Sequence, residues 1–210
     1  GTRMMLVLFT LLGVVMSALP ALIPARAESE AAVGILVAIM QAVVLLMISM
    51  GVAQTGFIEV LRRVDLQKPL PFPPSTTVFM EICAKAIPAT LAVMLGGAVA
   101  AAIRPSLLPV VFGTAILALP TAVFITGVVL MMTVLFPDVE DPAQRSFRNL
   151  MVMLGVVLGG AWAGGLFAGL CAFGAPPWIA ALPAAALNLG LSLGVALVAG
   201  RLYASYNPSE

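Results

Sequence analysis

Histidine is absent from this chain of 210 residues, which removes the commonest catalytic base and the commonest transition-metal ligand. Charge is also scarce, because 9% of the residues are charged, against roughly 25% in an average soluble domain. The net charge of +1 offers no electrostatic basis for binding nucleic acid. The chain lacks the GxxxxGK[ST] loop that cradles nucleotide phosphates, so it cannot hydrolyse ATP by itself. We therefore predict no catalytic residue, no metal site and no cofactor in this chain.

Long apolar runs dominate what is present, since 62% of the residues are hydrophobic. A core of this size cannot hide so much apolar surface from water, so the sequence predicts an all-α polytopic membrane protein. A transmembrane helix needs about 20 mainly apolar residues. We predict one transmembrane domain over 1–210, with cytoplasmic loops at 59–85 and 137–148. The six predicted spans are about 4–23, 32–58, 86–103, 107–136, 149–173 and 179–203.

The distribution of positive charge orients these spans with both termini in the cytoplasm. The outer side would then hold two positive residues, Arg26 and Arg104, and the inner side eight. This asymmetry follows the positive-inside rule and predicts an integral protein of the plasma membrane, in a bacterium the inner membrane. The eight inner residues are Arg3, Arg62, Arg63, Lys68, Lys85, Arg145, Arg148 and Arg201.

The start of the chain allows two interpretations. Residues 1–27 are either the first span or a signal peptide that ends near Ala27, and both place Glu28 outside. The chain begins with Gly1 rather than methionine, so we expect a processed chain, or a fragment or half of a longer permease.

The loop 59–85 is the longest polar segment and has the features of a docking element. A short amphipathic turn carries Arg62, Arg63, Asp65, Leu66 and Lys68. Prolines then end this turn, because each lacks an N–H and disfavours helical geometry in the preceding residue. The serine and threonines at 75–77 are predicted to cap the next helix.

The second polar loop, 137–148, carries a clear helix-start signal. Asp141 is a good N-cap residue and is followed by Pro142, which is favoured at the first helical position. We therefore predict that a helix starts there.

Few polar residues lie within the predicted spans, and none of them is acidic. Their absence weakens the case for a proton- or sodium-coupled carrier. The polar residues either form hydrogen bonds between helices or line a substrate path, and the pair Gly96-Gly97 serves either close helix packing or a hinge. The substrate-path candidates are Gln41, Gln54, Asn188 and Ser192.

The two loops resemble those of ABC exporter permeases of the type-2 class. The resemblance lies in a charged helix end followed by Lys68-Pro-Leu-Pro-Phe-Pro-Pro74, and in Phe136-Pro-Asp-Val-Glu-Asp-Pro-Ala-Gln-Arg145. It implies a membrane half-unit that pairs with a second six-helix unit, as a homodimer or as the other half, and with separate ATPase subunits that carry ATP and Mg. The amphipathic helix that usually precedes the first span is missing or reduced to residues 1–3. The implied ATPase-docking residues are Arg62, Arg63, Asp65, Leu66, Lys68, Phe72, Arg145 and Arg148.

Other functions remain open from the sequence. A rhomboid-type protease needs a serine–histidine pair and is excluded by the lack of histidine. A metal-dependent lipid transferase needs clustered carboxylates, and Asp138, Glu140 and Asp141 form the only such cluster. A stand-alone six-helix exporter and the membrane substrate-binding subunit of a vitamin importer also match the size and span number. Co-purification of an ATPase would separate the exporter permease from a free carrier.

Overall fold

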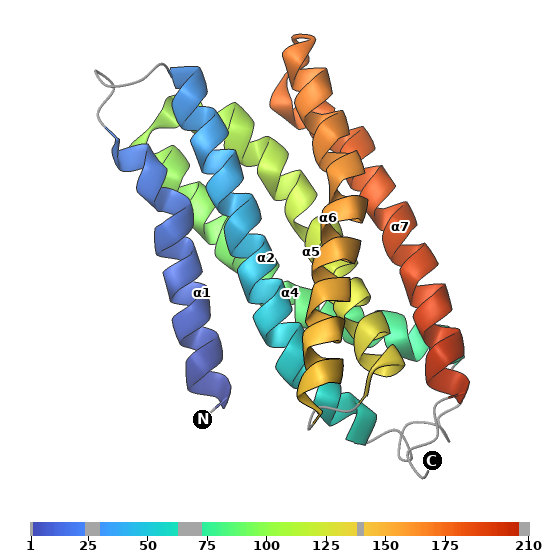
Figure 1. The fold of residues 1–210 in the computed structure, drawn as a ribbon. Coiled ribbons are helices and arrows are strands. Elements are labelled where there is room, and N and C mark those ends of the chain that lie inside the picture. Colours follow the sequence, from blue (N-terminus) through green and yellow to red (C-terminus); the bar gives the residue numbers. More distant parts are fainter. Residues whose placement is uncertain (1, 24–29, 63–72, 138–140, 206–210) are drawn as a thin grey trace.

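The computed structural model describes residues 2–23, 30–62, 73–137 and 141–205, which are almost entirely helical (Figure 1). Within these ranges there is no strand, so the all-α prediction is confirmed. The elements are α1 (Thr2–Ala18), η1 (Leu19–Leu22), α2 (Glu30–Arg62), α4 (Pro74–Ile103), η2 (Pro105–Leu107), α5 (Leu108–Leu135), α6 (Pro142–Ala172) and α7 (Pro177–Ser205), where η marks a short 3-10 helix.

Five of the helical segments are long and apolar enough to cross a bilayer, which indicates a membrane protein. The first segment is shorter: its apolar stretch covers Thr10–Leu22, within which α1 gives way to η1 at Leu19. Pro20 lies in the first turn of η1, where the missing N–H is tolerated, and it cannot continue the α-helical ladder. The five candidate spans are Glu30–Ala53, Pro74–Ile103, Pro105–Leu135, Pro142–Ala172 and Pro177–Ser205.

The helices run alternately up and down, so that α1 begins and α7 finishes at the same end of the array (Figure 1). α5 lies at the centre and packs against α2, α4, α6 and α7. The most apolar 18-residue stretch of α5 is 61% buried, compared with 17% for the corresponding stretch of α6. α5 is therefore the core helix, and α6 lies at the periphery.

The peripheral position of α6 leaves most of its apolar surface uncovered. Trp162 on this helix is 74% exposed, and Phe173 at its end is 92% exposed. Gly174 ends α6 with a φ of 89°, a left-handed conformation that glycine adopts without steric cost. The turn leads into α7, where Trp178 is 43% exposed.

The start of α6 confirms the predicted cap. Asp141 is the N-cap residue, and its Oδ1 accepts a hydrogen bond of 2.8 Å from the backbone N–H of Ala143. Pro142 occupies the first turn, where no intrahelical donor is needed. α6 therefore starts seven residues before the predicted span (149–173), because this polar first turn belongs to the same helix.

The start of α4 differs from the prediction. α4 begins at Pro74 and continues unbroken to Ile103, so the last part of the predicted loop 59–85 is helical. The N-cap residue is Pro73, and no side chain caps this end, so the predicted capping by residues 75–77 is wrong. The carbonyl of Pro73 instead accepts hydrogen bonds from the N–H groups of Thr76 and Thr77, at 2.9 and 3.2 Å. A proline in the first turn suits a helix start, which explains why the helix begins there.

Candidate functional site

The segments predicted to dock a partner converge at one end of the array, which we call the loop end. It comprises the end of α2 at Arg62, the start of α4 at Pro74, the α5–α6 turn and the end of α7 (lower end in Figure 1). Two of these elements are in close contact, because a Cβ added to Gly200 of α7 would lie 2.7 Å from the Cα of Ser75 in α4. The start of α4 is therefore held directly against the end of α7.

Most of the docking candidates in the first loop cannot be placed. Arg62 is the last residue of α2, and its side chain is outside the described part. The docking role of this segment stays a prediction. The candidates that lie outside the described residues altogether are Arg63, Asp65, Leu66, Lys68 and Phe72.

The two docking candidates on α6 have different surroundings. Arg145 is exposed, as a docking charge requires, whereas Arg148 is 5% exposed. The Nη1 atom of Arg148 donates a hydrogen bond of 3.4 Å to the carbonyl oxygen of Phe136, just beyond the end of α5. Carbonyls at a helix C-terminus lack intrahelical donors and carry partial negative charge, so a guanidinium is favourable there. Arg148 is thus a contact between α5 and α6 and not an exposed docking charge.

An aromatic pair supports the same turn between α5 and α6. The rings of Phe136 and Phe147 meet edge to face, with centroids 5.2 Å apart and planes at 82°. Such a pair stabilises packing by about 0.5–1.5 kcal/mol beyond its buried area. The sequence analysis did not single out these phenylalanines as a pair, although Phe136 directly precedes the predicted loop 137–148 and Phe147 lies near its end.

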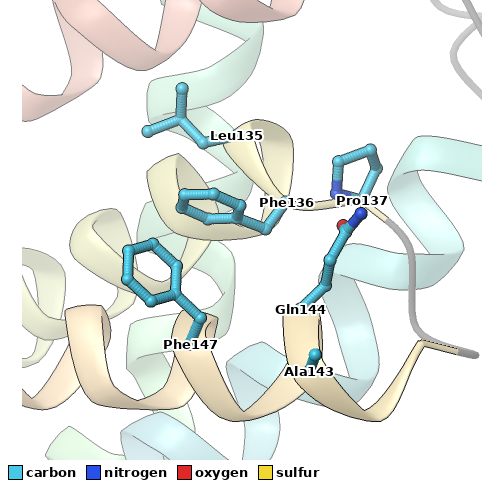
Figure 2. Close-up of a pocket in the computed structure, with 6 residues that line it drawn as sticks. All are labelled: Leu135, Phe136, Pro137, Ala143, Gln144 and Phe147. Atoms are coloured by element: carbon cyan, nitrogen blue, oxygen red, sulfur yellow. The ribbon is translucent and has the colours of Figure 1, made fainter.

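An open depression of about 510 Å³ lies at this turn. Figure 2 shows the two phenylalanine rings one above the other, with the side chain of Gln144 on the other side of the recess. The depression is mainly apolar and lies within a turn of the exposed Arg145 on α6. A partner with an apolar side chain beside an acidic one would complement it. The lining residues are Leu135, Phe136, Pro137, Ala143, Gln144 and Phe147.

Two of the substrate-path candidates, both on α7, make hydrogen bonds within the helix array. Nδ2 of Asn188 donates to Oγ1 of Thr121 on α5 at 2.8 Å, and Oγ of Ser192 donates to the carbonyl of Asn188 at 2.6 Å. Both residues are buried, with exposed fractions of 2% or less. The bond of Asn188 joins α7 to α5 and favours the interpretation of hydrogen bonding between helices, whereas the bond of Ser192 stays within α7.

Gln41 lies on α2 and has no hydrogen-bond partner. It is 2% exposed on α2, and neither Nε2 nor Oε1 makes a hydrogen bond. No contact joins α2 to α7 in the described part of the chain, so Gln41 and Asn188 belong to different interfaces. The side chain of Gln54 lies outside the described residues. The candidates therefore do not form one continuous path.

Acidic residues do not assemble a metal site in the ranges that the structure describes. No group of three or more histidine, cysteine or acidic side chains lies close enough there to hold a metal ion. Of the predicted carboxylate cluster, Asp141 caps α6, whereas Asp138 and Glu140 fall outside those ranges.

The arrangement of charge and helix ends is the remaining guide to function. Neither family models, nor curated proteins, nor solved structures match this chain. The resemblance to type-2 ABC permeases therefore rests on the two loops and on the helix order alone.

Proposed function

We propose that this chain is the transmembrane permease subunit of an ATP-driven ABC transporter, an exporter, coupled to a separate ATPase through the loop end. The supporting observation is that both polar loops start and finish at the same end of the array as the first residue of α1 and the last of α7 (Figure 1). The same end carries the exposed positive residues Arg145 and Arg201, whereas Arg104 lies at the opposite end. One end is thus suited to face the cytoplasm and receive a partner.

The helices offer a route for force from the loop end into the membrane. α4 is one unbroken helix of 30 residues, which corresponds to about 45 Å at 1.5 Å per residue. Because Pro88 lies within α4, a push on the segment before Pro74 would act first on the part of the helix that precedes this proline. The close contact between Ser75 and Gly200 would pass the same displacement to α7. ATP hydrolysis itself would occur in the partner, because this chain has no phosphate-binding loop.

The proposed assembly contains a second six-helix unit and two ATPase subunits in the plasma membrane. The test is affinity purification of the tagged chain from native membranes in mild detergent. We expect an ATP-binding cassette ATPase to co-purify, and ATP hydrolysis to disappear when that subunit is washed away. Robust hydrolysis by the isolated chain would refute the proposal. Substrate transport by the chain in liposomes without any ATPase would support a stand-alone carrier instead.

The orientation of the helices gives a second prediction. Thr76 is exposed at the loop end, and Ser106 is exposed at the opposite end. In a chain with Cys83 and Cys171 replaced by serine, an impermeant maleimide added to sealed cells should label Ser106→Cys and leave Thr76→Cys unlabelled. Permeabilised cells, in which both cysteines should react, provide the control. Labelling of Thr76→Cys in sealed cells would invert the proposed topology.

A further inference from the structure

An unpaired amide lies deep in the contact between α2 and α4. Gln41 is among the largest fully buried side chains, and both of its polar atoms lack a hydrogen-bond partner. Its Nε2 would lie 2.9 Å from a Cβ added to Gly97 of α4, so the amide is directed at this glycine. A buried amide without partners is strongly disfavoured, because nothing compensates the desolvation of its polar atoms.

A second unpaired polar group comes from α1 and contacts the neighbouring glycine. Ser17 is fully buried, and its Oγ has no hydrogen-bond partner. This oxygen would lie 3.1 Å from a Cβ added to Gly96. Ser17 and Gln41 therefore approach adjacent positions of α4 from two different helices. The glycine pair leaves the space in which both polar side chains fit.

The surroundings select the kind of group that these side chains can bind. The sequence places no charged residue on α2 between Glu30 and Glu59, or on α4 between Lys85 and Arg104. Gln41 is therefore about 16 Å along its helix from Glu30, at 1.5 Å per residue. A carboxamide both donates and accepts hydrogen bonds and carries no charge. The matching ligand is a neutral group with one donor and one acceptor.

α1 is the element that covers this position. It packs against α2 and α4 through small residues, since a Cβ added to Gly13 would lie 3.1 Å from Cβ of Ala92 and 2.7 Å from Cδ1 of Ile48. The opposite face of α1 is exposed, including Leu11 and Val15. In the described part of the chain, α1 makes no contact with α5, α6 or α7. Separation of α1 from α4 would therefore open this position while the contacts of α5 with α2, α4, α6 and α7 stay intact.

We propose that Gln41 and Ser17 form a binding site beside Gly96 and Gly97, lined by α1, α2, α4 and Val111 of α5, for a neutral group that donates and accepts hydrogen bonds. That group is either water or the hydroxyl or amide of a dissolved molecule. The site does not depend on the proposed ATPase, because it lies away from the loop end and uses residues of this chain alone.

The test measures whether water reaches this position because of Gln41. Val111 of α5 lines the position, since its Cγ1 would lie 2.9 Å from the Cβ added to Gly97. The full-length chain with Cys83 and Cys171 replaced by serine would carry Val111→Cys in lipid nanodiscs. We expect methyl methanethiosulfonate, a small neutral reagent that reacts with the thiolate of a hydrated cysteine, to label this residue, and at least tenfold more slowly when Gln41→Leu is added.

The matched control is Val123→Cys, at a residue of the same helix that is 2% exposed in the apolar core. Val123→Cys should not react, either with Gln41 present or with Gln41→Leu, and this result would exclude a general loosening of the fold. Gel filtration would show that each variant is monodisperse. Equal labelling rates at position 111 with and without Gln41→Leu, or no labelling there at all, would overturn the proposal.

A competition arm distinguishes the two sources of the ligand. Protection of Val111→Cys by decanamide, but not by decanoate, would identify a site for a neutral solute. A rate that depends on Gln41 but is unaffected by decanamide would identify water as the occupant. Equal protection by decanoate would contradict a site for neutral groups. Because no ATPase is present, failure of this test leaves the co-purification result unchanged.

Discussion

Replacement of Gly200 by alanine is expected to lower the free energy of unfolding by about 1–3 kcal/mol, the usual cost of overpacking. The new Cβ would lie 2.7 Å from the Cα and 2.9 Å from the backbone nitrogen of Ser75. Both atoms belong to the backbone, so a side-chain rotation cannot relieve the overlap. The end of α7 and the start of α4 would have to separate. Unfolding in bicelles by titration with dodecyl sulfate would measure the loss.

Gly194→Ala is the matched control for this prediction, because it lies on the same helix and a Cβ there meets nothing within 4 Å. Alanine is a better helix former than glycine by about 1 kcal/mol, so this variant should be unchanged or slightly more stable. An equal loss in both variants would show that the effect is not caused by the contact with Ser75.

Reversal of Arg62 and Arg63 to glutamate is expected to abolish recovery of the ATPase in a pull-down. If these residues meet an acidic partner surface, the reversal places like charges together, which costs several kcal/mol of interface energy. Six of the eight positive residues predicted on the inner side would remain, against two outside, so the orientation should not invert. Labelling of Ser106→Cys in the same background would verify the orientation.

The comparison variant for the docking test is Arg145→Glu. It should weaken recovery of the ATPase less, because the proposal places the main contact in the first loop and only a secondary contact in the second. Arg148 is unsuitable, since its burial against Phe136 means that a reversal would disturb the fold itself. Full recovery of the ATPase with the Arg62/Arg63 reversal, in correctly oriented protein, would contradict docking by this turn and favour a stand-alone carrier.

The sequence was sufficient to predict the helical class and most helix positions, because apolar runs and their polar interruptions are local properties. The start of α6 could be predicted for the same reason, since Asp141 and Pro142 act within one turn. A helix start near residues 75–77 was predicted, but the cap at Pro73 was not, because proline was interpreted there as a helix stop although it also suits a first turn.

The contacts between helices could not be predicted. Helices that are apolar on all sides show no amphipathic face, so their sequence does not say which side meets a neighbour. Arg148 was therefore grouped with Arg145, although one points into the helix contact and the other away from it. Gln41 and Asn188 were likewise grouped in one path, although they occupy separate interfaces. In both cases the distinction depends on residues far away in the sequence.

The exposure of α6 determines what tryptophan fluorescence can report about this protein. The chain has two tryptophans, Trp162 on α6 and Trp178 at the start of α7, and both are substantially exposed. Quenching by brominated lipids would therefore follow the α6–α7 hairpin. Movement of α1 away from α4 would leave the emission unchanged, because no tryptophan lies on α1, α2 or α4. A tryptophan introduced at Leu11, on the exposed face of α1, would give that helix a fluorescence signal of its own.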